Sequence, residues 1–221
     1  MSVDEVAADV AGTDHGGSVA RAAADIRSLI VRRVLVPKEQ VRQQDLARQI
    51  GTSRGPIREA LQVLAVEGIL RYEQNRGYFV TSFTADEMTQ LYRIRDLLES
   101  EILTHLPPAP PDLIERLREV NQQIRTGGDD LDRVIQLNRD FHDLIFATSP
   151  LHVLRTELDH VGRMTTAYQS LSINGLTNWD LLYQDHEEII AAWQAGDHNR
   201  LVAVSRRHRE TSLQRIAPIL G

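Results

Sequence analysis

Four side chains in the C-terminal part of the chain have the types and the spacing of a metal-binding site: Asn138, His142, His186 and His208. Asn138 and His142 are four residues apart and therefore share one face of a helix, whereas the other two histidines fall in separate helical segments. A helical bundle can bring side chains from three helices to a common point, where imidazole suits zinc, nickel and similar divalent ions. Since the chain has no cysteine, such an ion must be held by nitrogen and oxygen ligands.

The residues alone leave other uses of this set open. A single histidine on a helix is more often a core or surface residue than a ligand, and these side chains could also line a water-filled pocket or bind an organic effector directly. Three histidines and an asparagine also resemble a hydrolytic zinc site with an open position. A hydrolase needs a general base, however, and Asp140 or Glu187 would have to turn inward against helix geometry. We therefore expect no enzyme, and keep a metal-dependent hydrolase and a metal-sensing regulator as alternatives.

A second group with recognisable chemistry lies in the N-terminal part, in the run Ser53-Arg54-Gly55-Pro56-Ile57-Arg58. Arg54 and Arg58 are four residues apart and fall on one side of a predicted helix. Arginine can bond guanine O6 and N7 bidentately in the major groove, and backbone amides at a helix start suit a phosphate. The run Asn75-Arg76-Gly77 falls at a predicted hairpin tip, where Arg76 and Gly77 would form a wing that reaches the minor groove or the DNA backbone.

The elements that must position these arginines are three helices and a β-hairpin. The spacing of apolar residues predicts a helix from Val19 to near Pro37, a short helix over 44–50, and a third that Thr52 or Ser53 caps and Gly68 ends. Two β-rich runs, 69–73 and 78–81, flank an Asn/Gly turn and are typical of a hairpin. A helix–turn–helix followed by a hairpin is the order of a winged DNA-binding unit.

The rest of the chain has an almost entirely helical pattern. Thr84 is the predicted cap of a first helix, and the proline-rich segment 107–111 breaks the pattern. Further helices are predicted over 112–125, 129–147, 150–171, 178–195 and 197–217, with breaks at Gly127-Gly128, Ser149-Pro150, Asn174-Gly175 and Gly196-Asp197. This pattern indicates a bundle of six helices with short connections.

Charge divides the chain at the same places. The net charge of −6 argues against a nucleic-acid partner only if it is evenly spread. Residues 1–17 have four acids and no Lys or Arg, residues 18–81 have eleven basic and six acidic side chains, and residues 82–221 have fourteen basic and twenty-one acidic ones. A basic block followed by an acidic block indicates a separate unit that binds a polyanion.

The overall composition sets the class of protein. With 42% hydrophobic and 25% charged residues, the chain has the composition of an ordinary globular protein. Its apolar runs fall short of 18 residues and its first residues are acidic, so we expect neither a membrane span nor a signal peptide. The expected location is therefore the cytoplasm.

The run from Asp45 to Leu61, DLARQIGTSRGPIREAL, resembles the signature of GntR-type winged-helix transcription regulators, and the match continues through Leu64, Glu67-Gly68-Ile69-Leu70 and Asn75–Val80. The resemblance covers about 60 residues and implies that Ser53, Arg54, Arg58 and Gly77 contact operator DNA, together with Gly55, Pro56 and Arg76 of the same two segments. Two positions depart from the family pattern. Gly55 stands where the family usually has threonine, which removes a hydroxyl, and Lys38 follows Pro37 where the family has glycine.

The acidic part resembles the all-helical FCD effector domain of the FadR-like branch of these regulators, on the segments 91–99, Asn138 to His142, and His186 to His208. The resemblance implies a divalent metal on Asn138 and the three histidines, beside a pocket for a small carboxylate. It also places Arg95, Arg163 and Tyr168 along that pocket. Arg95 could bind a carboxylate bidentately or pair with Glu99 one turn away, and Arg163 and Tyr168 could equally be packing residues.

These features together give one expectation for the whole chain. Residues 1–17 form a disordered tail, residues 18–81 a winged helix-turn-helix, and residues 82–221 a bundle of about six helices, so the fold is mainly α. Its expected function is that of a ligand-responsive transcription regulator, most often a repressor in this family. It would bind a pseudo-palindromic operator in double-stranded DNA as a homodimer and respond to a small organic acid near a zinc or nickel site.

Overall fold

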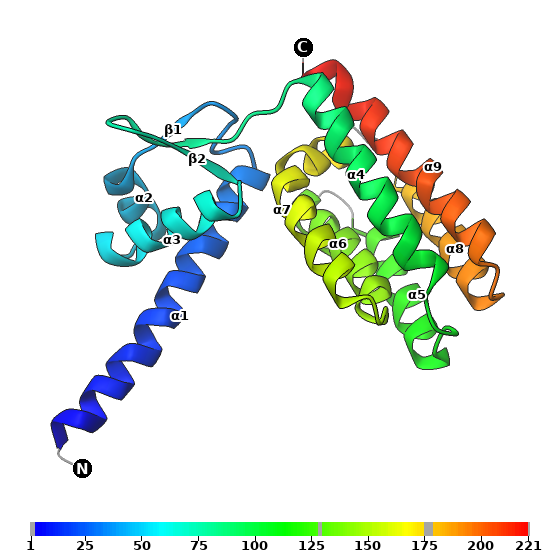
Figure 1. Cartoon of the computed structure of the whole chain (residues 1–221), viewed down its shortest axis with the longest axis horizontal. Helices are drawn as coiled ribbons and strands as arrows, with labels where there is room; N and C mark the ends of the chain where they lie inside the picture. The colour runs from blue at the N-terminus through cyan, green and yellow to red at the C-terminus, as the bar shows by residue number, and fades with distance from the viewer. Residues whose placement is uncertain (1–2, 128–129, 175–178, 221) are drawn as a thin grey trace. The chain divides into compact units, whose positions relative to one another are not determined.

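The computed structural model describes residues 3–127, 130–174 and 179–220 (Figure 1). The chain divides into two compact units, Met1–Ser82 and Phe83–Gly221. The first combines helices with a small antiparallel sheet and the second is helical, which confirms the expected fold class. Among the described residues, no helix combines the length and the apolar character that crossing a membrane requires.

The first unit is a three-helix winged helix. Its elements are α1 (Val3–Val31), β1 (Gln40–Val41), α2 (Gln43–Ile50), α3 (Arg54–Val66), β2 (Leu70–Glu73) and β3 (Gly77–Val80). The sheet has the order β1-β3-β2, with Gln40 and Arg71 both opposite Phe79. The expected hairpin is therefore present, and a two-residue strand that sequence analysis did not predict extends it on one edge.

Local sequence explains why α2 and α3 begin and end where they do. Gly51 closes α2 with φ of 74°, in the left-handed region that glycine adopts at low cost, and its N–H donates to the carbonyl of Ala47. Gly68 turns the chain in the same way after α3, with φ of 75°. The inward face of α3 is completely buried and forms the centre of this unit with residues of α1 and the sheet: Ala22, Ile26, Ile57, Ala60, Leu61, Leu64, Leu70 and Val80.

The N-terminal helix differs from the sequence expectation at both ends. It begins at Val3, so residues 3–17, which we expected to be a disordered tail, continue the helix, consistent with an alanine-rich segment without proline whose Asp4 and Glu5 stand at a helix N-terminus. It ends at Val31 rather than near Pro37. After it, Lys38 has φ of 71°, a left-handed conformation that accounts for the glycine at this position in the family pattern.

The second unit contains the six expected helices. They are α4 (Ala85–Thr104), α5 (Pro111–Arg125), α6 (Leu131–Ala147), α7 (His152–Asn174), α8 (Asp180–Gln194) and α9 (His198–Ile216), followed by a 3₁₀ turn (Ala217–Ile219). The proline-rich break after α4 is held by Trp193, whose Nε1–H donates to the carbonyl of Pro107 at 3.0 Å. The breaks expected at Gly128 and Gly175 lie outside the described residues.

Packing within the bundle places side chains from α4, α5, α6, α7, α8 and α9 in one core. α4 packs against α7 and α9, and α8 packs against α5 and α9. Thr84 forms a full capping box with Glu87, as expected from its position before α4. The largest side chains of the core are completely or almost completely buried: Trp193, Phe141, Ile102, Leu103, Leu117 and Ile124. This core positions the side chains of His142, His186 and His208.

Candidate functional site

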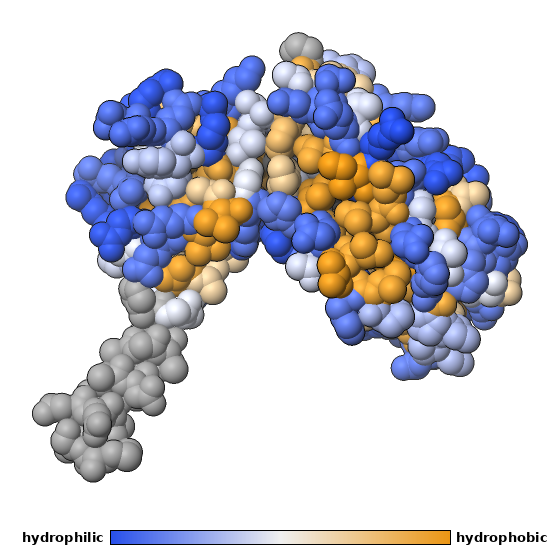
Figure 2. Space-filling view, viewed as in Figure 1, coloured by the Kyte–Doolittle hydropathy of each residue, from blue (hydrophilic) through white to orange (hydrophobic). Residues whose placement is uncertain are grey.

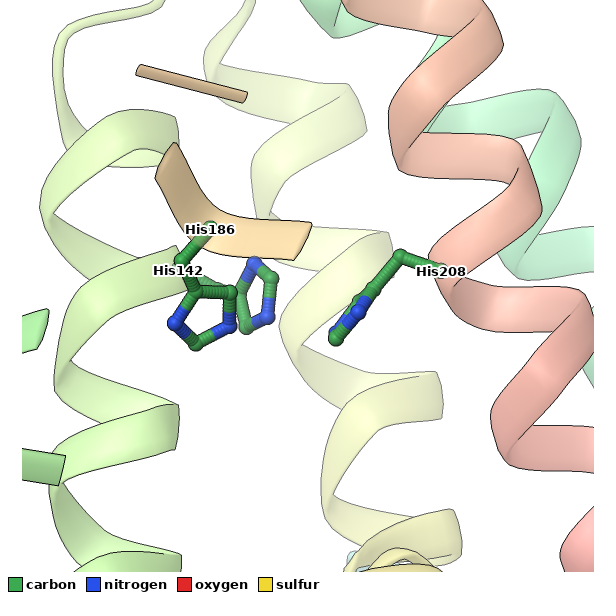
Figure 3. Close-up of side chains that lie close together, drawn as sticks. All are labelled: His142, His186 and His208. Atoms are coloured by element: carbon green, nitrogen blue, oxygen red, sulfur yellow. The ribbon is translucent and has the colours of Figure 1, made fainter. Parts of the chain in front are cut away.

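Three histidines meet inside the second unit, as the sequence predicts. His142 comes from α6, His186 from α8 and His208 from α9, and Figure 3 shows their rings converging. One ring nitrogen from each lies within 4.8 Å of the others, and each pair of ring centroids is 5.2 Å apart. Two nitrogens on one zinc ion stand roughly 3 to 3.5 Å apart, so the three rings are slightly more open than a closed ligand set.

The His186 ring is held in a single orientation. It is completely buried and stacks on Phe141 with 3.9 Å between ring centroids. Its Nδ1–H donates to Oδ1 of Asn121 at 3.1 Å, and Asn121 in turn donates through Nδ2 to the Tyr183 carbonyl and to Glu187 Oε1. Nε2 of His186 is buried and has no hydrogen-bond partner among the described residues. A neutral imidazole therefore directs a lone pair into the cluster.

The His208 ring is oriented by a carboxylate. Its Nδ1 is 3.2 Å from Asp185 Oδ2, and the His208 side chain is only 11% exposed. Burial raises the pKa of Asp185, but the hydrogen bond and charge of His208, with Arg207 and Arg215, outweigh it and the net pKa is lowered. A carboxylate bonded to the outer nitrogen of a histidine is the usual support of a metal ligand. Asp185 and Asn121 are thus supporting residues that sequence analysis did not identify.

His142 completes the cluster, and the protonation of two of its rings can be inferred from their surroundings. Burial lowers the pKa of His142 and of His186 well below the ordinary value, and neighbouring positive charge lowers each further. Both rings are therefore neutral at neutral pH and can donate lone pairs. One turn before His142, Oδ1 of Asn138 is buried without a hydrogen-bond partner among the described residues. Unsatisfied buried nitrogen and oxygen atoms of this kind fit a divalent ion such as zinc or nickel.

A cavity of about 50 Å³ adjoins the cluster. Asn138, His142 and His208 line it, together with Tyr92, Arg95, Glu99 and Arg209. Arg95 donates to Glu99 Oε1 through Nε at 3.1 Å and Nη2 at 2.9 Å, so the predicted pairing one turn away is present and Arg95 also faces the cavity. Tyr92 Oη and Arg209 Nε are buried without a hydrogen-bond partner among the described residues. Such atoms mark a polar ligand pocket.

Two other residues expected along the pocket lie elsewhere in the same unit. Arg163 pairs with Asp159 on the same helix. Tyr168 packs with Met88, Tyr92 and Ile216, and its hydroxyl accepts a hydrogen bond from the Phe83 amide at 3.0 Å. Neither residue is among those that line the 50 Å³ cavity.

The two acids considered as general bases are engaged away from the cluster. Glu187 accepts from Asn121, and Asp140 accepts from Gln136 at 2.7 Å. The outward direction of Asp140 agrees with its place two residues from His142 on the same helix. The cluster thus has the nitrogen donors of a binding site, and these two carboxylates are bonded to side chains outside it.

In the first unit the predicted DNA-contacting residues form an exposed surface at the start of α3. Ser53 is the N-cap with no hydrogen bond from its side chain to the helix, and Arg54 and Arg58 are exposed. Pro56 is buried and anchors the first turn. A Cβ added at Gly55 would meet nothing within 4 Å, so this position leaves the surface open at the centre of the motif.

The wing tip is fixed by backbone conformation and by one aromatic ring. Asn75 and Gly77 have φ of 62° and 89°, which turns the chain tightly between β2 and β3. The Arg76 guanidinium lies 5.0 Å from the Phe79 ring centroid and 2.5 Å from Glu73. Gln40, from the unpredicted strand β1, donates to the Arg76 carbonyl at 2.5 Å. Arg76 is therefore exposed but held at the tip.

An exposed arginine pair at the start of the second helix of a helix–turn–helix, a wing, and a helical unit with a pocket lined by buried polar groups together define a transcription regulator with an effector domain. Comparison with known families agrees: residues 19–80 match the bacterial regulatory proteins of the gntR family, and residues 90–211 match the FCD domain. The FCD match covers more than half of the chain. The chain belongs to the GntR family of bacterial transcription regulators and carries an FCD domain, which confirms the family predicted from sequence.

Individual relatives are consistent with this assignment. The chain is 29% identical over 170 residues to the uncharacterized HTH-type transcriptional regulator YdhC of Bacillus subtilis. The aligned region spans 74% of this chain and 75% of YdhC. The chain is 30% identical over 106 residues to the gluconate operon transcriptional repressor of Bacillus licheniformis, spanning 48% of this chain and 43% of that protein. Escherichia coli McbR/YncC has the same fold, with a TM-score of 0.74 at 20% identity over 92% of this chain and 96% of that one.

Proposed function

We propose that this regulator is a repressor controlled by a small organic acid. Residues 18–81 bind operator DNA, and residues 82–221 bind the acid in the cavity beside the histidine cluster. The observation that carries the proposal is the convergence of unsatisfied buried atoms on one cavity, namely Tyr92 Oη, Asn138 Oδ1 and Arg209 Nε, next to His186 Nε2. Burying polar atoms without partners costs free energy, so their concentration here supports a ligand site. Such a protein acts where its operator lies, in the cytoplasm.

DNA recognition is assigned to the two exposed segments of the first unit. Arg54 and Arg58 are the residues that would read guanine in the major groove. Ser53 and the backbone N–H groups in the turn before Pro56, that of Gly55 included, would contact phosphate. Arg76 and Gly77 would place the wing against the minor groove or the backbone. The support is the exposure of Arg54, Arg58 and Arg76, and the tight turn with positive φ at Asn75 and Gly77 that presents Arg76.

A homodimer is part of the proposal, because a winged helix that reads a pseudo-palindrome needs a second copy about one turn of DNA away. The second unit offers a surface for it on α4, where Ile94 is 44% and Leu97 65% exposed. Figure 2 shows apolar surface over this part of the unit. Exposed apolar side chains gathered on one face support a protein interface.

The dimer is tested by Leu97→Glu, with Leu181→Glu as the matched control, because Leu181 is a comparably exposed leucine (57%) on α8. We expect Leu97→Glu to shift the protein to monomer in sedimentation or light scattering and to weaken operator binding at low protein concentration. Leu181→Glu is expected to stay dimeric. A dimer that withstands Leu97→Glu would exclude this face.

A divalent metal on Asn138, His142, His186 and His208, with zinc or nickel the ions of choice, is the second part of the proposal. When bound, such an ion supplies a Lewis-acidic centre that attracts a carboxylate oxygen. The chain's own contribution is orientation: Asn121 and Asp185 fix two rings, and the surrounding core excludes bulk water.

The effector class is a small carboxylate. Buried arginine is the side chain that binds carboxylate bidentately, and Arg95 and Arg209 both line the cavity. The gluconate operon repressor, a relative by sequence, is named for the operon of a carboxylate, which is consistent with this class.

The proposal is tested by titrating organic acids into the complex of the full chain with DNA from its own upstream region, at fixed zinc. Release of the DNA by one acid and retention with chloride at equal ionic strength would support acid control. Release by zinc or nickel alone would favour the second candidate function, metal sensing, which the histidine cluster also supports. Indifference to every acid and metal would reject ligand control.

A further inference from the structure

Buried Arg209 and the largely buried Arg95 share one buried carboxylate inside the effector unit. Arg95 and Glu99 lie one turn apart on α4, and Arg209 reaches Glu99 from α9. Their side chains are 15%, 5% and 6% exposed, respectively. Burying charges is costly unless they are paired, so Glu99 compensates positive charge that the core would not otherwise tolerate.

This ion-pair group lies in the effector cavity itself. All three residues line the 50 Å³ cavity beside the histidine cluster, which has room for a few waters and is small for an organic acid. A neighbouring groove of about 490 Å³ between α6 and α7 shares Arg95, Asn138 and His142 with the cavity. The groove offers space for the body of an acid, and Arg95 stands at the shared wall. The Glu99 carboxylate therefore occupies the deep position that an entering carboxylate would need.

The two arginines differ in the acidic partners that they would keep if Glu99 moved away. Arg209 also bonds Asp96 Oδ1 at 2.5 Å. Burial raises the pKa of Asp96, but the hydrogen bonds and charges of Arg206 and Arg209 outweigh it, and the net pKa is lowered. Among the described residues, Glu99 is the one acid bonded to Arg95, whose guanidinium also lies 5.3 Å from the centroid of the Tyr92 ring. Arg95 is thus the cation that would exchange one carboxylate for another.

We propose that Glu99 is an internal competitor for the effector: its carboxylate holds the anion position of the cavity, and an acid binds by displacing it from Arg95. The inference rests on the proposed acid-binding function and adds the residue that sets its threshold. An internal competitor reduces the apparent affinity for the acid by the fraction of molecules in which it holds the site. Glu99 thereby excludes weak or abundant monoanions and admits an acid that also gains contacts in the groove or at the histidine cluster.

The test compares Glu99→Gln with Asp96→Asn in the full-length protein. Each change removes one negative charge from the same group of ion pairs, but Asp96 is absent from the cavity lining. Acetate serves as the probe, titrated at constant ionic strength against chloride and followed by thermal unfolding and calorimetry, once with zinc and once with a chelator. We expect Glu99→Gln to bind acetate at least about tenfold more tightly than the natural chain. Asp96→Asn should not differ from the natural chain.

Each outcome decides the inference. Equal acetate affinity in Glu99→Gln and the natural chain, or an equal gain in Asp96→Asn, overturns it. Glu99→Asp, which keeps the charge on a shorter side chain, is measured alongside and should show a smaller gain in the same direction. If Glu99→Gln does not fold, an unchanged affinity in Glu99→Asp overturns the inference. Release of operator DNA by an acid in the natural chain, together with no effect at residue 99, would retain the proposed function and reject only this competitor role.

Discussion

The two units hold their functional side chains in opposite ways. Arg54, Arg58 and Arg76 of the winged helix are exposed, and turns and a helix start present them to solvent. In the effector unit, the exposed fraction of the whole residue is 0% for His186, 3% for Glu99 and 6% for Arg209. Each of these side chains is positioned by another side chain. A side chain that faces solvent can change without disturbing its unit, whereas a buried one takes part in the stability of the fold. Binding and stability should therefore separate in the first unit and change together in the second.

The largest effect should come from removing two histidines of the cluster that we propose binds a metal. His186→Ala with His208→Ala should abolish bound zinc and, with it, the stabilisation that zinc provides, about 4 kcal/mol at a zinc concentration 1,000 times the dissociation constant. Elemental analysis and thermal unfolding with zinc and with a chelator measure both. His105→Ala, an exposed histidine on the same unit, is the control and should keep both. Full zinc content in the double variant would refute the site.

A loss of binding without loss of stability is expected from Arg58→Ala. If Arg58 reads a base, specific operator affinity should fall by roughly 1–3 kcal/mol, while the melting temperature stays unchanged because the side chain is exposed. A gel-shift titration and a melting curve test the two halves. Arg116→Ala, an exposed arginine of the effector unit, should leave both values unchanged. A lowered melting temperature in Arg58→Ala would break the contrast between the units.

Binding and stability should fall together in Asn121→Leu. The change removes the hydrogen-bond partner of His186 Nδ1 and leaves Glu187 and the Tyr183 carbonyl without their donor. Zinc affinity should drop by about 10- to 100-fold, as for other supporting residues of metal ligands, and the melting temperature should fall even in chelator. Gln122→Leu, the exposed neighbour, should do neither. Normal zinc affinity in Asn121→Leu would show that His186 needs no external orientation.

The smallest effect concerns two glycines of the winged helix and has opposite signs. Gly77 has φ of 89°, so Gly77→Ala should cost about 1 kcal/mol of unfolding free energy through backbone strain alone, since an added Cβ meets no atom within 4 Å. Gly55 lies inside α3 with equally open space, so Gly55→Ala should raise stability by up to about 1 kcal/mol. Denaturant unfolding of the full chain measures both. Equal signs would contradict this account.

Sequence predicted the winged helix almost completely because its information is local. Gly51, Gly68 and Pro56 punctuate helices within a few residues of the side chains they position, and the whole motif lies in one continuous run. The two-residue strand β1 was missed, since Gln40-Val41 acquires its strand character only by pairing with β3. The helical continuation of α1 through residues 3–17 was missed for a related reason: without an amphipathic stripe, no packing surface marks those residues as helical.

The candidate site was predicted only in part, because the residues that orient its histidines are separated from them by long stretches of chain. The three histidines were found by residue type and helix assignment, but Asn121 lies 65 residues from His186. A signal did exist: Asn121 interrupts the apolar stripe that Leu117 and Ile124 form on α5, and Glu99 interrupts the one that Tyr92 and Ile102 form on α4. A polar residue on a buried stripe marks a side chain with a buried partner. Which partner it meets depends on the packing of other helices.

The helix α4, which begins at the capping box of Thr84, can act as a lever. The helix extends 20 residues, about 30 Å at 1.5 Å per residue, and Arg95 lies about 15 Å from its beginning at Ala85. A tilt of about 5° around Arg95 would move that beginning by about 1.3 Å at this length. Ala85 comes three residues after Ser82, the last residue of the first unit, so any tilt of α4 that accompanied the proposed exchange of partners at Arg95 would be largest near the point where the chain leaves for that unit.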